Sequence, residues 1–413
     1  MGSYSTFPRT LPLLLLIFSK KFIKKKLIIV NKLCWENRVS SSYFCRANKS
    51  KKDFEMNNET DNTYKTKTIP KIVTYWLILG LVLIFFQVII GGITRLTGSG
   101  LSITKWDIVT GTIPPISEAS WNEEFLKYQQ TPQYQKINQG MSMGDFKFIF
   151  FWEYFHRLWA RSLGFIFLIP FLIFYRKKYF PNWLIKRLGI LVLLGMVVAL
   201  FGWIMVASGL VDRPWVNAYK LSLHLSLAII VYVYLLWTVL MVVQPKVEGL
   251  KKSWIRKGAI AILIIAAIQI FLGGMMSGMK AGLAFPTFPD MKGSYFPALL
   301  FDLSNWHWAN FEEYDKNPFM ATFVQFFHRN VAYILSIVII WFYVKIRKET
   351  ISNIFKKYST WMLVMLIIQV GLGIITIMNC LGKVPVMWGS FHQGGAILLF
   401  TTIVMVLYQT KER

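Results

Sequence analysis

Four of the five histidines in the sequence lie inside long apolar segments, and they suggest a cofactor site. They are His156, His224, His328 and His392, whereas His307 lies in a polar stretch and suggests a surface or loop-packing residue. Ionisable side chains are costly at membrane depth, usually face a bundle interior and are functional hypotheses by default. Two facing imidazoles in an apolar bundle could provide the axial ligands of a haem iron. The alternative for any one of them is a hydrogen bond between helices.

Charged residues flank two of these histidines. Arg157 and Arg329 each directly follow a histidine, and Arg161 lies one turn beyond Arg157. A guanidinium suits a haem propionate through bidentate hydrogen bonds. Snorkelling of the long side chain to the membrane interface is the alternative for Arg157 and Arg329, and it explains Arg161 less well.

Glu153 is the only acidic residue within the predicted spans, and it precedes His156 by three residues. This spacing places both side chains on nearly the same helix face. One interpretation is an i,i+4 ion pair with Arg157. The other is a proton-transfer or charge-stabilising group beside the first histidine pair. The second half of the chain has no counterpart, because Val324 and Gln325 occupy the equivalent stretch, and this asymmetry favours a functional role.

Composition indicates that membrane-spanning helices position these residues. Of the 413 residues 55% are hydrophobic and 16% charged, whereas soluble domains carry about 25% charged residues. Runs of about 20 apolar residues span a bilayer. Eight spans are predicted, near 72–92, 146–174, 184–207, 218–242, 256–276, 319–344, 358–379 and 386–408.

The net charge of +26 indicates membrane orientation and not nucleic-acid binding. The connections on one face, with both chain ends, carry 20 Lys/Arg against three acids, and those on the other carry 10 against eleven. The basic face lies toward the matrix or cytoplasm, so both termini are predicted there. The long loops 93–145 and 277–318 are predicted to face the opposite compartment as folded segments that cap the histidine sites.

An internal repeat divides the spans into two sets of four. The tripeptide 155–157 recurs as 327–329, and Gly91-Gly92 recurs as Gly273-Gly274. Four spans per half give both halves the same orientation. The predicted fold is an all-α polytopic membrane protein with two tandem pseudo-symmetric four-helix bundles, over 71–245 and 246–413. Each bundle would hold one pair of histidines at similar depth, and four-helix bundles build cofactor sites from such facing side chains. The repetition favours cofactor ligation, and a zinc or non-haem iron site would require further carboxylates or thiolates.

Residues 1–70 are predicted to be a presequence and disordered basic extension outside the fold. Residues 1–52 contain 12 Lys/Arg and a single acid, Glu36, which is typical of an organelle presequence, here interpreted as mitochondrial. A secretory signal or a cytoplasmic tail of a bacterial protein are the alternatives. The three cysteines form no CxxC pair, so they predict neither a disulfide framework nor a thiolate metal site.

The chain from about residue 72 to 408 resembles the haem A synthases, which act in cytochrome c oxidase assembly. The matching stretches are residues 91–102 (GGITRLTGSGLS), 109–115 (VTGTIPP), 153–157 (EYFHR), 281–284 (AGLA), 287–289 (TFP), 325–329 (QFFHR) and 391–396 (FHQGGA). Phe285-Pro286 replaces the Tyr-Asn expected before Thr287. The outer loops lack the cysteine pairs of some bacterial members, so the chain resembles the mitochondrial or alphaproteobacterial type.

The resemblance implies an eight-helix oxidoreductase that oxidises the C8 methyl of haem O to the formyl of haem A, with water implicated as the oxygen source. It implies that the first bundle binds the substrate haem and the second a resident bis-histidine haem B. The residues implied are Glu153 as the catalytic acid, His156, His224, Arg157 and Arg161 at the substrate haem, and His328, His392 and Arg329 at haem B.

The resemblance also implies a location and partners. The location is the mitochondrial inner membrane, and the partners are membrane lipid, a haem O synthase, a ferredoxin-type electron donor and a second copy of the chain, with no nucleic acid. Two other functions use the same sequence features. A dihaem electron-transfer protein reducing a quinone or metal would use the four histidines but leaves Glu153 without a role. A transporter with parallel repeats would require broken helices and more polar residues near the membrane midplane than these spans contain.

Overall fold

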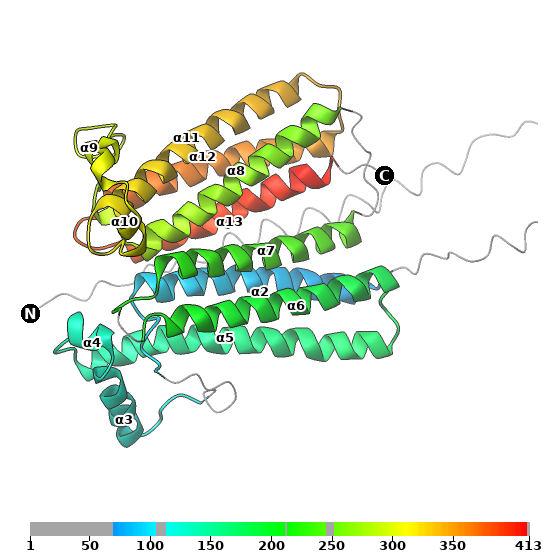
Figure 1. Cartoon of the computed structure of the whole chain (residues 1–413). Coiled ribbons are helices and arrows are strands. Elements are labelled where there is room, and N and C mark those ends of the chain that lie inside the picture. Colours follow the sequence, from blue (N-terminus) through cyan, green and yellow to red (C-terminus); the bar gives the residue numbers. More distant parts are fainter. Residues whose placement is uncertain (1–68, 105–112, 211–212, 245–251, 411–413) are drawn as a thin grey trace, which may run out of the picture. The chain divides into compact units, whose positions relative to one another are not determined.

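The structure is a computed structural model that describes residues 69–104, 113–210, 213–244 and 252–410. The predicted presequence and basic extension over 1–70 therefore lies outside the described residues, apart from 69–70. The described chain is all-helical, as predicted. Two of the connections between its long helices, α2 to α5 and α8 to α11, contain helices of their own (Figure 1).

Eight helices in the described residues are long and apolar enough to cross a membrane, which confirms the eight predicted spans. They are α2 (Lys71–Leu96), α5 (Met143–Arg176), α6 (Asn182–Ala207), α7 (Ala218–Val243), α8 (Ser253–Gly278), α11 (Phe319–Arg347), α12 (Asn353–Met378) and α13 (Val386–Tyr408). The largest difference is at α12, which was predicted from 358. Lys356 and Lys357 lie in its first turns, where a helix end can expose charged side chains to water while its backbone stays helical.

The eight helices lie in two groups of four. Figure 1 shows α2, α5, α6 and α7 together and α8, α11, α12 and α13 together. Within the first group, α2 contacts α5 and α7, and α6 contacts α7; in the second, α11 contacts α8 and α12, and α13 contacts α8 and α12. The groups meet where α7 packs on α8 and where α13 packs on α2 and α7.

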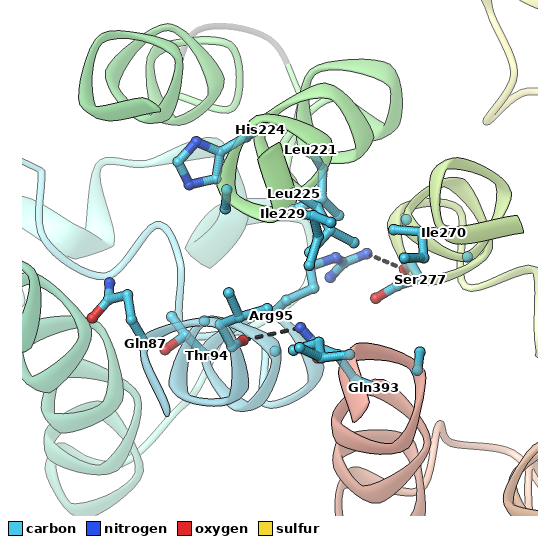
Figure 2. Close-up of a pocket in the computed structure, with 18 of the residues that line it drawn as sticks. Gln87, Thr94, Arg95, Leu221, His224, Leu225, Ile229, Ile270, Ser277 and Gln393 are labelled. Carbon is cyan, nitrogen blue, oxygen red and sulfur yellow. Dashed lines mark hydrogen bonds between the residues drawn. The ribbon is translucent and has the colours of Figure 1, made fainter. Parts of the chain in front are cut away.

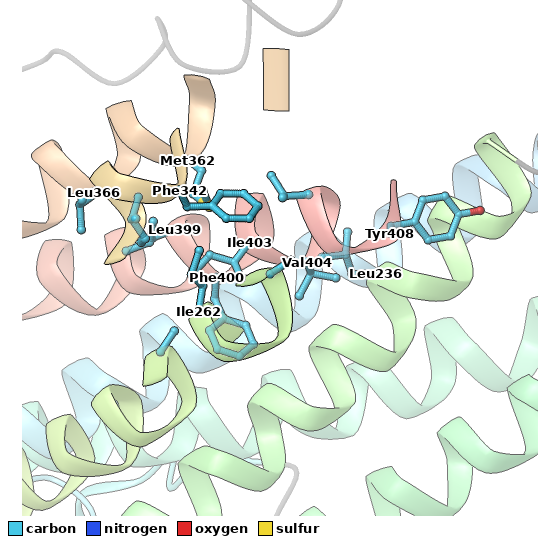
Figure 3. Close-up of a cluster of buried hydrophobic side chains, with 14 of the residues drawn as sticks. Leu236, Ile262, Phe342, Met362, Leu366, Leu399, Phe400, Ile403, Val404 and Tyr408 are labelled. Atoms are coloured by element: carbon cyan, nitrogen blue, oxygen red, sulfur yellow. The ribbon is translucent and has the colours of Figure 1, made fainter. Parts of the chain in front are cut away.

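One hydrophobic core crosses the boundary between the groups. Its buried side chains include Leu236 of α7, Ile262 of α8, Phe342 of α11 and Ile403 of α13 (Figure 3). A hydrogen bond of 2.8 Å between Tyr232 Oη and Thr401 Oγ1 also joins α7 to α13. Because apolar packing and hydrogen bonding are continuous between them, the two groups form a single packed unit.

The second glycine of each repeated pair allows close packing between the groups. A Cβ on Gly274 would lie 2.8 Å from Ser222 Cα of α7, and one on Gly92 would lie 1.7 Å from Gln393 Oε1 of α13. Gln393 Nε2 donates a 2.9 Å hydrogen bond to the Val88 carbonyl oxygen of α2. Small residues let helix backbones approach closely in membranes. The second glycine of each pair, Gly92 and Gly274, is therefore accounted for by close packing between the two groups of helices.

The connections 97–142 and 279–318 contain short helices. The first contains α3 (Glu118–Gln129) and α4 (Pro132–Lys136), and the second contains α9 (Ala298–Phe301) and α10 (Trp308–Glu312). Tyr128 of α3 is fully buried against Phe146, with ring centroids 5.2 Å apart. The aromatic cluster around it fixes the first connection on the start of α5.

Candidate functional site

A cavity of about 1380 Å³ runs through the helix bundle, and all four predicted histidines line it. The predicted charged residues Glu153, Arg157, Arg161 and Arg329 line it as well. Pockets for small ligands usually measure about 300–1,000 Å³, so this cavity is larger than one such ligand requires. His307 is exposed at the start of α10 and is not among the lining residues.

Each cavity histidine lies against a glycine of the neighbouring helix. A Cβ placed on Gly91 would lie 2.9 Å from Cε1 of His156. The same distance of 2.9 Å separates a Cβ on Gly202 from His224 Cε1, and a Cβ on Gly373 from His392 Cε1. At Gly273 the distance to His328 Cε1 would be 3.4 Å. Glycine therefore leaves the space that the imidazoles occupy. The first glycine of each repeated pair, Gly91 and Gly273, is accounted for by the histidine ring beside it.

A glutamine one turn before the glycine contacts three of these histidines. Gln87 Nε2 lies 3.1 Å from His156 Nδ1, Gln269 Nε2 lies 3.1 Å from His328 Nδ1, and Gln369 Nε2 lies 3.0 Å from His392 Nδ1. Each amide also donates to the backbone carbonyl of its histidine. Sequence reasoning missed these glutamines, although the thrice-repeated spacing Gln-x-x-x-Gly was a visible signal.

The second histidine pair has a geometry that suits one metal ion between two imidazoles. The ring centroids of His328 and His392 lie 6.4 Å apart, and the ring planes differ by 77°. A metal–nitrogen bond is about 2 Å long, which places the ring centres of two trans imidazoles about 6 Å apart. The separation, the apolar walls and the glycine-made space fit a planar haem with two axial histidines.

Glu153 is the one acid among the described residues that line the cavity, and 3% of its surface is exposed. Its Oε2 accepts from Ser102 N at 2.7 Å, Ser102 Oγ at 2.8 Å and Ile103 N at 2.9 Å. Its Oε1 accepts from the Arg157 guanidinium at 2.6 Å. Every one of these partners is a donor, and donors of this kind stabilise a negatively charged carboxylate. The i,i+4 pair considered from the sequence is thus present, together with three contacts that the sequence did not predict.

The turn that carries Ser102 is linked to the folded first connection. Gln133 Nε2 donates to the Gly98 carbonyl oxygen at 2.9 Å, and Tyr128 Oη donates to Gln133 Oε1 at 3.1 Å. Burial raises the pKa of Tyr128 to about 12, so its phenol stays protonated and able to donate throughout the physiological range. The chain of hydrogen bonds fixes the donors of Glu153 through α3 and α4.

The predicted arginines differ in their contacts. Arg157 binds Glu153 and also donates to the Ile103 carbonyl oxygen at 3.3 Å. Arg329 donates instead to four carbonyl oxygens of the second connection, those of Phe285, Thr287, Pro289 and Asp290. Phe285 therefore acts through its backbone, so the departure at Phe285-Pro286 leaves this contact intact.

Arg95 is a further cavity residue that sequence reasoning did not select. Its guanidinium reaches from α2 to the last turn of α8, where it donates to the carbonyl oxygens of Ser277 and Gly278 at 2.9 Å each. Figure 2 shows this contact beside His224 and Gln393 at the boundary between the two groups. A cation at a helix C-terminus is favoured by the helix dipole, so Arg95 stabilises the junction of the halves.

The helices and cavity define an integral membrane protein with paired internal histidines. Residues 74–404 match the family described as cytochrome oxidase assembly protein. The chain is 40% identical over 349 residues to heme A synthase of Nitrosospira multiformis, covering 84% of this chain and 95% of that protein. It is 39% identical over 349 residues to heme A synthase of Flavobacterium psychrophilum, covering 83% and 99%. The chain belongs to the haem A synthase family.

Proposed function

We propose that this chain converts haem O to haem A and that its two histidine pairs bind two haems. The oxidoreductase activity follows from the family, whose members match the chain over most of its length. The observation that supports haem binding is the common cavity lined by four histidines, two of which have ring centroids 6.4 Å apart. The dihaem carrier considered from the sequence leaves the buried Glu153 site without a role.

We assign the two haems to different halves. The bundle over 71–245 binds haem O between His156 and His224, and the bundle over 246–413 binds a resident haem B between His328 and His392. Haem B when bound supplies one-electron transfer. The N-terminal histidine pair has Glu153 three residues before its first histidine, and the C-terminal pair has Gln325 at that position. Of the two proposed haem sites, the haem O site therefore has a carboxylate at this position and the haem B site does not.

Glu153 acts on the substrate through its negative charge. Conversion of the C8 methyl to a formyl adds one oxygen atom, taken from water in this proposal, and releases four protons and four electrons to an external acceptor in successive two-electron steps, so positive charge develops at the reacting carbon. A fixed carboxylate beside the rim of the porphyrin stabilises that charge. To accept a proton on Oε2, Glu153 would first lose one of the donors from Ser102 or Ile103.

The arginines position the substrate and the resident haem. We propose that Arg157 and Arg161 face the propionates of haem O and Arg329 those of haem B. A guanidinium and a carboxylate form parallel hydrogen bonds, and all three arginines line the cavity. Arg157 would then bridge a propionate and Glu153, linking substrate placement to the catalytic carboxylate.

We further propose that the protein is a multi-pass protein of the mitochondrial inner membrane with both termini in the matrix. The basic composition of residues 1–52 and the charge difference between the two faces support this placement. A haem O synthase, a ferredoxin-type donor and a second copy of the chain are the proposed partners. A tag near Gln133 should be cut by protease added to mitoplasts, and cutting only from the matrix side would reverse the orientation.

Co-expression with a haem O source, followed by chromatography of the extracted haems, tests the activity. Haem A should accumulate only when the chain is present and should be lost in Glu153→Gln. The matched control Glu123→Gln changes an acid on the exposed face of α3 and should leave haem A formation unchanged. Formation of no haem A by a folded, haem-B-loaded wild-type protein would reject the function.

A further inference from the structure

Three helices of the bundle share one local arrangement around a histidine, and a fourth helix departs from it. In α2, α8 and α12 a glutamine precedes a glycine by four residues, and the pair contacts a histidine of the next long helix. In α6 the glycine is Gly202, but Val198 occupies the glutamine position. The departure concerns His224, whose ring still lies 2.9 Å from a Cβ placed on Gly202.

His224 consequently lacks the glutamine amide contact that the other three imidazoles have. Its Nδ1 atom is buried and has no hydrogen-bond partner among the described residues. The corresponding Nδ1 atoms of His156, His328 and His392 lie within 3.1 Å of a glutamine amide. At the Val198 position only the backbone carbonyl contacts the His224 ring, and no side-chain amide does so.

A glutamine amide can hydrogen-bond an imidazole in either tautomer, because a half-turn exchanges its donor nitrogen and its acceptor oxygen. Histidine bound to a metal through Nε2 carries its proton on Nδ1 and usually donates it to an oxygen, which fixes the ring and raises the basicity of the ligand. The Oε1 atoms of Gln87, Gln269 and Gln369 are buried and unpaired among the described residues. A half-turn of the amide would turn this oxygen to Nδ1 as the acceptor, in exchange for the hydrogen bond that Nε2 now donates to the carbonyl oxygen of the histidine. A valine side chain offers neither group.

The distribution of the amides separates a permanent site from an exchangeable one. Both histidines of the C-terminal pair contact a glutamine, as a resident group requires. In the N-terminal pair only His156 does. A substrate must enter and a product must leave at each turnover, and this is easiest where one axial ligand is weakly fixed.

We infer that His224 is the axial ligand that gives way during substrate entry and product release, and that Val198 in place of glutamine makes it do so. This inference rests on the proposed binding of haem O between His156 and His224. Val198 is a positioning residue in this scheme, because it acts through His224 and contributes no group to the reaction. The difference between glutamine and valine sets the exchange rate of each haem site.

Haem transfer from purified protein to excess apomyoglobin tests the inference, because absorbance follows release directly and needs no turnover. The protein is co-expressed with a haem O source, and the haems remaining on it are separated by chromatography at each time. In the wild type, haem O and haem A should leave faster than haem B. Val198→Gln should slow the release of haem O and haem A about fivefold, the effect of one added hydrogen bond.

Two further variants complete the test. Val198→Leu adds bulk without an amide, and its release should stay within about twofold of the wild type. Gln369→Val is the converse change, and it should speed release of haem B about fivefold. If Val198→Gln does not accumulate, Gln369→Val alone decides. Unchanged haem B release from folded Gln369→Val, or wild-type release rates in haem-loaded Val198→Gln, would overturn the inference, whereas a wild-type protein that binds no haem O would reject the proposed function itself.

Discussion

The N-terminal and C-terminal halves place the same side chains in the same way around their first histidine, yet they differ at the position three residues before it. In the first half this residue is Glu153, which accepts four hydrogen bonds from donors. In the second half it is Gln325, which donates to the Phe285 carbonyl oxygen at 2.7 Å. Glutamate and glutamine have nearly the same shape, so the side chains at this position differ between the halves in charge and not in shape.

The surrounding chain follows this difference. The connection after α2 turns backbone N–H groups of Ser102 and Ile103 toward Glu153, whereas the connection after α8 turns carbonyl oxygens toward Gln325 and Arg329. Each loop therefore complements the residue it meets. One side chain and the polarity of the loop that meets it therefore differ together between the two halves.

The largest expected effect separates the two histidine pairs. With the proposed haem assignment, His328→Ala or His392→Ala should abolish the α-band of haem B in purified protein, because each removes one of the two axial ligands that we propose for it. His224→Ala should leave that band intact and lower only the haem O and haem A content. Optical spectra and pyridine haemochrome analysis measure both. A full haem B spectrum in the His328→Ala, His392→Ala double variant would break the assignment of the halves.

Glu153→Gln makes the first half resemble the second at its distinguishing position. We expect haem A formation per mole of haem-B-loaded protein to fall at least about 100-fold, because the variant keeps the size of the side chain and loses its charge. Haem O or a hydroxylated intermediate should remain bound.

The same variant tests the structural alternative. If Glu153 served only to neutralise Arg157, the variant would lower the amount of folded protein and leave turnover per molecule near normal. Chromatographic yield of folded protein and haem A per haem B therefore give opposite results for the two roles. Near-normal turnover would show that the charge difference between the halves is structural.

The sequence predicted the parts of this comparison that depend on hydropathy and repetition. Eight apolar runs defined the helices, and the repeat around His156 and His328 identified the cofactor candidates. Membrane helices are predictable because every backbone group must be satisfied within the segment. The start of α12 was wrong by five residues because Lys356 and Lys357 masked it.

The contacts of Glu153 could not be predicted in this way. Ser102 and Ile103 lie about 50 positions before Glu153, and nothing in local periodicity indicates which backbone N–H groups a loop will turn inward. The glutamines were predictable in principle, since Gln87 and Gly91 repeat their spacing at two further places. Glutamine is uncharged, however, and an argument based on the cost of buried charge does not select it.

Gln325→Glu is the converse of Glu153→Gln and should have a moderate effect. The new carboxylate would face the Phe285 carbonyl oxygen, which now accepts a 2.7 Å hydrogen bond. We expect a loss of about 1–2 kcal/mol in the free energy of unfolding, from one broken hydrogen bond and one repulsive contact. Attraction to Arg329 four residues later offsets a few tenths of this. Thermal unfolding followed by haem absorbance measures it, and a stability equal to the wild type would show that the loop polarity is not matched to Gln325.

The smallest effect concerns the glycines behind the C-terminal histidines. Gly373→Ala would place a Cβ 2.9 Å from His392 Cε1, whereas Gly273→Ala would place one 3.4 Å from His328 Cε1. The first distance requires the imidazole to move, and the second is at the edge of ordinary contact. We therefore expect Gly373→Ala to weaken haem B retention. Gly273→Ala should retain haem B within about twofold and stabilise α8 by up to about 1 kcal/mol, since alanine is the better helix former. Haem content per protein and thermal midpoint give both quantities. Equal losses of haem B in the two variants would mean that the glycines set helix packing in general and not the position of each ligand.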